Sequence, residues 1–339
     1  MTDAGNGPLL PASPGIPDLR FRTYRGEEDI AAIAGLLRAS YTANGETISV
    51  DPDELRNEFR DSPTADPEQD MVLGFVGDRL VARSFIEWAD TPDGAARYYE
   101  SWGDIDPEWR RRGMGAEMWE RNMRRLTGLA HEQGFAGRRI LTVPWLRGGD
   151  VGGAVLAERL GYERVRVYHH MTRPAMAGIE VPPMPEGLEV RPVTKEHLPA
   201  IWAAMTEAFR DHFGAFDTSE SSFRTWIARR TLDLSLLVVA FDGEEIAGAV
   251  HGVIDPAENE TQGYERGWTD PIYTRRPWRR RGLASALVGR ALVRLRDRGM
   301  TSAQLDVDTE NEHNALTLYE HHGFVADRSA TEWHKPLTM

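Results

Sequence analysis

Two stretches of the sequence are near copies of one another: residues 105–115 read IDPEWRRRGMG, and residues 274–284 read TRRPWRRRGLA. In each stretch, three arginines stand directly before a Gly-x-Gly or Gly-x-Ala triplet. The glycines that follow the arginines, Gly113 and Gly282, lie 169 residues apart, and the strand-like openings LRFR and LEVR show the same offset. The repeat therefore covers nearly the whole chain and indicates a tandem duplication of one domain.

The length and composition agree with two domains of one kind. A chain of 339 residues exceeds what one hydrophobic core usually fills, and 41% hydrophobic with 27% charged residues is typical of globular proteins. We expect a disordered tail at 1–18, an N-terminal domain at 19–172 and a C-terminal domain at 187–339. Between the domains, residues 173–186 hold four prolines and predict a stiff linker.

Each half has the same order of expected elements. A short strand and an amphipathic helix come first, followed by a hairpin that turns at Asp242-Gly243 in the second half. A strand then runs into the arginine-rich loop, and a helix, a strand, a short helix and a closing strand complete the half. This order predicts an α+β fold with an α/β mixed sheet: two tandem domains, each a mixed β-sheet flanked by helices. The helix after the second loop has an expected apolar face formed by Leu283, Leu287, Val288, Ala291, Leu292 and Leu295.

The arginine-rich loops are candidate anion sites. A helix N-terminus presents unpaired N–H groups and a partial positive charge, small residues let the backbone approach an anion, and arginines neutralise it. The loop is not a Walker loop, because no Gly-Lys-Ser/Thr follows, and it lacks the three spaced glycines of the dinucleotide fingerprint. A solvated charged face is the alternative, but recurrence at one place in both halves favours a site for a phosphate ester.

The pattern Arg-x-x-Gly-x-Gly/Ala after a hydrophobic strand resembles the pyrophosphate loop of the GNAT acetyltransferase superfamily, which binds acetyl-CoA. The second half also has the family's later element, residues 311–324, which ends in Tyr319-x-x-x-Gly323-Phe324. The arrangement of two halves is similar to that of mycothiol synthase-like two-domain members, in which the C-terminal half is active. The resemblance implies an acyltransferase with acetyl-CoA as its co-substrate.

The resemblance also implies which residues bind the coenzyme. In that family the strand before the loop splays from its neighbour, and its free backbone groups hold the pantetheine arm and polarise the thioester carbonyl. In the second half this backbone belongs to Ile272, Tyr273 and Thr274. The remaining expected binding residues are Arg279, Arg280, Arg281, Gly282, Leu283, Ala284, Ser285 and Asn311, with Arg110, Arg111, Arg112, Gly113, Met114 and Gly115 at the first loop.

A proton must leave the acceptor and another must reach the leaving thiolate. The resemblance implies that Tyr319 is the acid, and a packed helix aromatic is the alternative. Strand side chains alternate, so Asp270, Ile272 and Thr274 are expected on one face, with Asp270 as the preferred base. A turn-forming Asp-Pro is the alternative for Asp270. Glu265 is the second candidate base, and the expected lining residues include His212 or His251.

The first half departs from the pattern at these positions. Its matching residues are Ala157, Gly149 and Ser101, in place of the tyrosine, the asparagine and the aspartate. A methyl group cannot donate a proton, so we expect that the first half has lost catalysis and keeps a coenzyme-binding or purely structural loop.

Composition excludes several function classes. The chain has no cysteine, which removes disulfides, thiolate zinc sites and a cysteine nucleophile. A net charge of −13 disfavours nucleic acid and anionic membranes and favours a cationic small molecule. No apolar run reaches membrane-spanning length and the first residues lack signal-peptide features, so we expect a cytoplasmic protein. Histidines paired as neighbours at 169–170 and 321–322 do not converge, so no metal is expected.

Together these features predict an N-acyltransferase whose C-terminal half transfers an acetyl group from acetyl-CoA to the amine of a small molecule, by direct attack on the thioester. Two alternatives stay open: a thiol–sugar conjugate as acceptor, as in mycothiol synthase-like members, or a non-catalytic acyl-CoA sensor or scaffold. The sequence leaves open the acceptor, the acyl chain length and whether the chain forms a homodimer.

Overall fold

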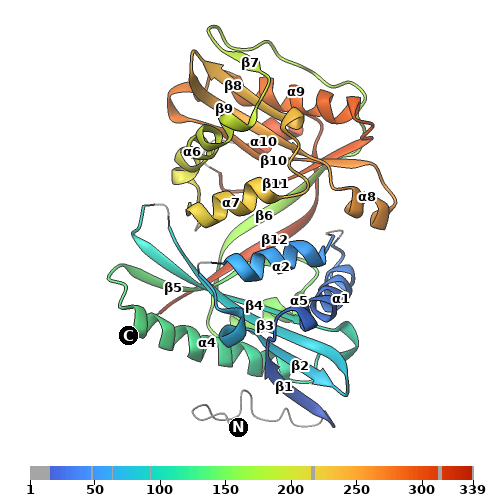
Figure 1. The fold of residues 1–339 in the computed structure, drawn as a ribbon, viewed down its shortest axis with the longest axis vertical. Coiled ribbons are helices and arrows are strands. Elements are labelled where there is room, and N and C mark those ends of the chain that lie inside the picture. The colour runs from blue at the N-terminus through green and yellow to red at the C-terminus, as the bar shows by residue number, and fades with distance from the viewer. Residues whose placement is uncertain are drawn as a thin grey trace. The chain divides into compact units, whose positions relative to one another are not determined.

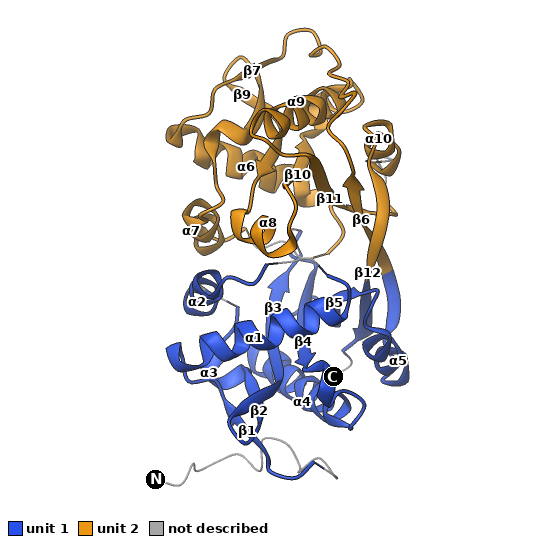
Figure 2. Ribbon diagram, turned by 90° about the vertical axis from the view of Figure 1, so that its right-hand side faces the viewer, with its two compact units in different colours: residues 1–165, 215–217, 331–339 blue, residues 166–214, 218–330 orange. Residues whose placement is uncertain are grey.

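The computed structural model describes residues 16–46, 49–62, 64–91, 93–214, 218–311 and 315–337. The chain divides into unit 1 (residues 1–165, 215–217 and 331–339) and unit 2 (residues 166–214 and 218–330), coloured separately in Figure 2. The predicted domain boundaries follow the sequence repeat. The boundaries between the two units of the structure instead lie inside two strands, β6 (Glu163–Arg173) and β12 (Val325–Pro336). Residues 174–187, within and just beyond the predicted linker, form neither helix nor strand. Most of the predicted tail at 1–18 lies outside the described residues.

Unit 1 contains a mixed sheet whose strands are hydrogen-bonded in the order β1-β2-β3-β4-β5-β12 (Figure 1). One hydrophobic cluster lies against α1 and α2, and others lie against α4. The elements before β6 are β1 (Leu19–Thr23), α1 (Glu27–Ala43), α2 (Pro52–Asp61), α3 (Pro67–Asp70), β2 (Val72–Val76), β3 (Arg79–Asp90), β4 (Ala96–Ile105), η1 (Pro107–Trp109), α4 (Met114–Gln133), β5 (Arg138–Arg147) and α5 (Val151–Arg159).

Unit 2 repeats this plan with the strand order β12-β6-β11-β10-β9-β8-β7. Its elements are β7 (Glu189–Arg191), η2 (Lys195–His197), α6 (Leu198–Ala208), η3 (Phe209–Asp211), α7 (Glu220–Ala228), η4 (Leu234–Leu236), β8 (Leu237–Asp242), β9 (Glu245–Val253), α8 (Pro256–Gln262), β10 (Arg266–Thr274), η5 (Arg276–Trp278), α9 (Leu283–Asp297), β11 (Ser302–Asp308) and α10 (Ala315–His321). The predicted mixed α/β architecture is confirmed in both units.

Helix α9 packs on the unit 2 sheet through the face predicted from its periodicity. All six residues of that face are buried in one hydrophobic cluster together with residues of β8, β9 and β11. Burying a Leu or Val side chain stabilises by about 1.5–3 kcal/mol, so this face anchors the helix that follows the arginine-rich loop. Within the described residues, no helix combines the length and apolar character needed to cross a membrane.

A short parallel strand pair occurs in each unit, among the residues that the structure describes. β10 pairs with β11 only from Arg266 to Trp268, although β10 continues to Thr274. In unit 1, β4 pairs with β5 from Ala96 to Glu100 and then continues to Ile105. The carboxyl end of each central strand therefore has free backbone groups on its parallel side. The arginine-rich loop follows directly.

A β-bulge distinguishes β10 from β4. The register between β10 and β9 shifts between Thr269 and Ile272, whereas β4 keeps one register with β3 over its whole paired length. Proline has no N–H to give to a sheet, and Pro271 lies within this shift, where a bulge tolerates it. The expectation that Asp270, Ile272 and Thr274 share one face is wrong, because the extra residue interrupts the alternation. Ile272 packs against the cluster beneath α9, whereas Tyr273 donates a hydrogen bond to the Ile201 carbonyl of α6 (3.2 Å).

Three carboxyl groups lie together in unit 1. Glu100 is on β4, opposite Glu87 of β3 in the strand register, and Glu332 of β12 is the third. Burial, with repulsion from Glu87 and then Glu332, raises the pKa of Glu100 well above its ordinary value. Glu87 accepts a hydrogen bond from the Trp102 indole (2.7 Å), and Glu332 contacts His334 (2.6 Å).

The substitution Glu100→Gln should stabilise the protein at pH 8 and have little effect at pH 4. A carboxyl whose pKa is raised by folding ionises first in the unfolded chain, so wild-type stability falls as pH rises from about 4.3 toward the folded pKa. The amide removes this dependence. Thermal unfolding between pH 4 and 8 measures it, with Glu158→Gln, an exposed carboxyl on α5, as the control for charge. Parallel pH profiles for wild type and Glu100→Gln would contradict the interpretation.

Candidate active site

The two arginine-rich loops have the same backbone conformation. The middle arginine of each loop is in the left-handed region, with φ of 64° at Arg111 and 58° at Arg280. The glycine that begins the following helix is left-handed too, with φ of 91° at Gly113 and 82° at Gly282. A left-handed arginine is uncommon, so its presence at both places indicates a loop shape inherited by both halves. Successive N–H groups in such turns, together with a helix N-terminus, form a concave anion site.

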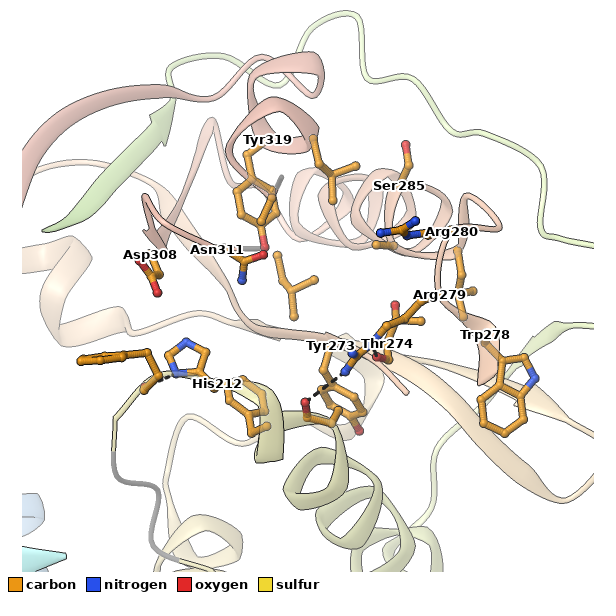
Figure 3. Close-up of a pocket in the computed structure, with 18 of the residues that line it drawn as sticks. His212, Tyr273, Thr274, Trp278, Arg279, Arg280, Ser285, Asp308, Asn311 and Tyr319 are labelled. Carbon is orange, nitrogen blue, oxygen red and sulfur yellow. Dashed lines mark hydrogen bonds between the residues drawn. The ribbon is translucent and has the colours of Figure 1, made fainter. Parts of the chain in front are cut away.

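In unit 2 this loop forms one wall of a cavity of about 700 Å³ (Figure 3). Ten of the coenzyme-binding residues expected in the second half line it: Ile272, Tyr273, Thr274, Arg279, Arg280, Gly282, Leu283, Ala284, Ser285 and Asn311. Tyr319 and His212 also line it. Arg281, Asp270 and the six expected residues of the first loop do not. Lining residues that the sequence analysis did not single out are Arg166, Ala208, Phe209, Phe213, Trp278, Asp308, Glu310, Ala315 and Leu318. Of these, Trp278, Ala315 and Leu318 lie inside the two quoted motifs, and the others belong to no local motif.

The three arginines of the unit 2 loop have different roles. Arg279 donates hydrogen bonds to the Thr274 carbonyl (2.9 Å) and the Ala208 carbonyl (3.3 Å), which ties the loop to β10 and α6. Arg281 is exposed and donates to a backbone carbonyl at Glu186 (2.9 Å). Arg280 is also exposed, lines the cavity, and forms no ion pair with any residue in the described ranges. Arg280 is therefore the guanidinium available to an anion.

Ser285, in the first turn of α9, is held by a buried histidine. Its hydroxyl lies 2.8 Å from His322 Nε2, and the Arg173 guanidinium donates to the His322 carbonyl. Burial, with the neighbouring His321 and Arg173, lowers the pKa of His322, so the ring is neutral at pH 7. This network fixes the serine hydroxyl at the edge of the anion site. The sequence analysis had considered this histidine only as a metal ligand.

Tyr319 points its hydroxyl into the cavity, near Asn311 (Figure 3). Its side chain is 7% exposed, and its ring packs edge-on to Phe324 with a centroid separation of 6.2 Å. Burial, and to a lesser extent the charge of Asp270, raises the pKa of Tyr319 above its ordinary value. The phenol is therefore protonated at neutral pH and can donate a proton.

Asp270 lies in the bulge of β10, next to Pro271, and is accessible to solvent. The protein around it still desolvates the carboxyl, and this, with repulsion from Asp306, raises the pKa of Asp270 to about 7, against the opposing charge of Arg229. A base with a pKa near neutrality is well matched to work at pH 7. The electrostatic effect of Asp270 on Tyr319 shows that the candidate acid and base share one region of unit 2.

The other candidates lie elsewhere. Glu265 directly precedes β10, at the opposite end of the strand from Thr274 and the cavity. His251 is buried against the rings of Trp226 (5.5 Å) and Tyr273 (5.8 Å), and burial lowers the pKa of His251 to about 3. His251 is thus a neutral packing residue. No cluster of three or more metal-ligating side chains occurs among the residues with described positions.

In unit 1 the position that matches Asn311 is packed against backbone. Gly149, which takes the place of Asn311, lies so close to α1 that a Cβ would meet the Asn44 carbonyl oxygen at 2.1 Å. The Arg147 guanidinium stacks on the Tyr41 ring at 4.0 Å, so the ends of β5 and α1 contact each other. Arg110 donates to the Ile105 carbonyl (3.1 Å) and thus repeats the tie made by the first arginine of unit 2. The unit 1 loop therefore keeps its structural bonds, while packed backbone replaces the cavity-lining Asn311 of unit 2.

The sequence is similar to one family model and to several known proteins. A family model described as the Acetyltransferase (GNAT) family matches residues 201–324. Mycothiol acetyltransferase of Geodermatophilus obscurus is 29% identical over 323 residues, which cover 90% of this chain and 94% of the relative. Mycothiol acetyltransferase of Salinispora arenicola is 30% identical over 239 residues, covering 69% of this chain and 76% of the relative.

Solved structures show the same fold. A GCN5-related N-acetyltransferase from Sphaerobacter thermophilus superposes with a TM-score of 0.70 at 22% identity, covering 95% of this chain and 97% of that one. A tandem GNAT protein from the clavulanic acid biosynthesis pathway superposes with a TM-score of 0.63 at 15% identity, covering 95% and 99%. Both matches cover the two halves together.

Arg280→Gln and Arg279→Gln should affect different properties: the first the affinity for acetyl-CoA, the second the thermal stability of the protein. Arg280→Gln should weaken acetyl-CoA binding roughly 10- to 100-fold, as expected for loss of one charge-assisted hydrogen bond, and leave thermal stability unchanged. Arg279→Gln should lower the unfolding temperature, because two backbone carbonyls lose their donor. Calorimetric titration and thermal unfolding measure the two effects. A stability loss in Arg280→Gln with unchanged affinity would refute the assignment.

Each chain should bind one molecule of acetyl-CoA, because unit 1 has packed backbone at Gly149 where Asn311 lines the cavity of unit 2. Gly282→Glu should abolish binding, since it places a carboxylate and a strained side chain in the unit 2 anion site. Gly113→Glu imposes the same left-handed strain in unit 1 and should leave binding intact. Equilibrium dialysis gives the stoichiometry, and two molecules bound per wild-type chain would show that the unit 1 loop also binds coenzyme.

Proposed function

Because the chain belongs to the acetyltransferase (GNAT) family, whose members use acetyl-CoA as donor, we propose that unit 2 acetylates the amine of a thiol-bearing sugar conjugate, namely mycothiol that lacks its acetyl group. One observation carries this proposal: the unit 2 cavity joins the anion site at α9 to the Tyr319 hydroxyl, and unit 1 has no counterpart to that tyrosine.

The relatives support this acceptor over an unspecified small-molecule amine. Those covering most of this chain are named mycothiol acetyltransferase, which backs the thiol–sugar alternative of the sequence analysis better than its main prediction of an unspecified small-molecule amine. The charge distribution suits an acceptor amine, which is cationic before reaction. Asp308 and Glu310 line the cavity, but Arg166 pairs with both of them (3.6 and 2.6 Å). The negative charge that acts on Tyr319 is that of Asp270.

The residues of unit 2 account for each step of a direct transfer. Asp270 accepts a proton from the acceptor ammonium and leaves a neutral amine. The amine nitrogen attacks the thioester carbonyl carbon, and the N–H groups freed where β10 leaves β11 are placed to receive the negative charge on oxygen. The carbon–sulfur bond then breaks, and Tyr319 donates its hydroxyl proton to the leaving sulfur. The nitrogen loses its second proton, which restores the Tyr319 phenol, and Asp270 releases the first proton to solvent. The products are an N-acetyl amide and coenzyme A.

Tyr319→Phe should lower kcat by about 10²–10⁴-fold and leave the Kd for acetyl-CoA unchanged, because the ring is kept and only the proton donor is lost. The acceptor has its own thiol, so product formation is best followed by mass spectrometry rather than with thiol reagents. Hydroxylamine then distinguishes the products, since it cleaves an S-acetyl thioester and spares an N-acetyl amide.

Leu318→Ala, which alters a neighbouring lining residue without removing a proton donor, is a suitable control for general damage to α10. Undiminished turnover in Tyr319→Phe would remove the tyrosine from the mechanism. Acetyl-CoA binding without transfer to the des-acetyl conjugate, or to a panel of primary amines, would instead favour the acyl-CoA sensor.

A further inference from the structure

A second carboxylate lies near Asp270 in the unit 2 sheet. The last parallel pair between β10 and β11 joins Trp268 to Gln304. Asp306 is two residues beyond Gln304, so its side chain points to the face that Trp268 and Gln304 share. Asp270 is two residues beyond Trp268, inside the bulge, and the repulsion between Asp270 and Asp306 indicates that the two carboxylates are near each other. The two carboxylates therefore stand on either side of the place where the strands separate.

Asp306 is held by a histidine from the neighbouring strand. His170 of β6 is its register partner, and His170 Nδ1 lies 3.0 Å from Asp306 Oδ1. The His170 ring meets the Trp268 ring edge-on at 5.4 Å, and the Trp268 indole donates to Glu258 of α8 (3.0 Å). This hydrogen bond between His170 and Asp306 fixes the direction of the Asp306 carboxylate.

The charges facing Asp270 come from several elements. Asp306 of β11 repels it, and Arg229, at the end of α7, attracts it. The hydroxyl of Tyr319, on α10, is the neutral proton donor on the cavity side. Glu258 is engaged by Trp268 and by the Gln304 amide (2.9 Å). Among the residues that the structure describes, Asp270 has no ion-pair partner, so the pair of carboxylates keeps an excess of negative charge.

We propose that Asp306, anchored by His170, is a positioning residue of the acceptor site, where it and Asp270 together hold the acceptor's ammonium group before Asp270 removes its proton. This inference rests on the proposed function. An ammonium has three N–H donors and can bond to both carboxylates while relieving their repulsion. After the transfer Asp270 is a neutral acid, Asp306 remains ionised, and the amine is free to attack the thioester.

Asp306 also sets the pH at which Asp270 works. Its repulsion contributes to the raised pKa of Asp270, about 7, so removing that charge lowers the pKa. The base must be ionised to act, and kcat/KM falls as pH drops through its pKa. In Asp306→Asn the acidic limb of the kcat/KM profile therefore moves to lower pH, a change that a merely structural role would not produce.

The experiment measures acetylation of des-acetyl mycothiol by wild type, Asp306→Asn and Asp297→Asn. The last variant removes an exposed carboxylate at the end of α9 and matches the change in net charge. We expect Asp306→Asn to raise the KM for the acceptor roughly 10-fold or more, to move the acidic limb to lower pH and to leave the KM for acetyl-CoA unchanged. Asp297→Asn should match wild type in all three.

An unchanged acceptor KM and acidic limb in Asp306→Asn, alongside an inactive Asp270→Asn, would overturn this inference and leave the proposed function standing. Wild type that acetylates no amine would overturn the proposed function. Calorimetric binding of the acceptor to wild type and Asp306→Asn then still tests the carboxylate pair, and equal affinities would refute it. If Asp306→Asn does not fold, His170→Gln, which weakens the anchor and keeps the charge, should raise the acceptor KM with little shift of the acidic limb.

Discussion

The pairing of β10 with β11 stops after Trp268, and the rest of the unit 2 site depends on that separation. Backbone N–H and C=O groups normally find partners within a sheet, and those of the last residues of β10 have none on the β11 side. They are free to meet an extended ligand instead. The arginine-rich loop begins where β10 ends, Tyr319 approaches from α10, and the carboxylates of both strands emerge beyond the last pair.

The duplication shows which parts of this site serve folding. Arg279 and Arg110 make the same hydrogen bond to the carbonyl at the end of the preceding strand, and the left-handed arginine after each is also repeated. These bonds shape the loop whether or not the unit binds a ligand. What differs is the space beyond the loop: Asn311 borders a cavity in unit 2, while Gly149 packs against Asn44 in unit 1.

Positive and negative groups lie at different places in unit 2. The chain is strongly acidic, with a net charge of −13, yet the N–H groups of the loop and Arg280 make one end of the cavity attractive to an anion. At the other side of the strand gap, Asp270 and Asp306 attract a cation. An anionic donor and a cationic acceptor are thus drawn to neighbouring places, where desolvation keeps Tyr319 protonated and brings the pKa of Asp270 close to neutrality.

The sequence by itself determined the duplication, the mixed α/β fold and the anion-binding loop, because these follow from local rules: a repeat offset, helical and strand periodicity, and small residues at a helix start. It also marked the loss of the tyrosine in the first half. The alternation rule failed after Asp270, because Pro271 introduces a bulge that strand periodicity does not reveal.

Only the tertiary structure decided which arginine is free, that Gly149 packs against Asn44 and where Asp270 has its charged neighbour. The bond of Arg279 to Ala208 and the pair of His170 with Asp306 join residues far apart in the chain. Such contacts depend on which strands become neighbours in the sheet, and no spacing along the sequence encodes that order. Local sequence therefore determines the arginine-rich loop and the fold class. The contacts that give the site its chemistry depend on strands that become neighbours only on folding.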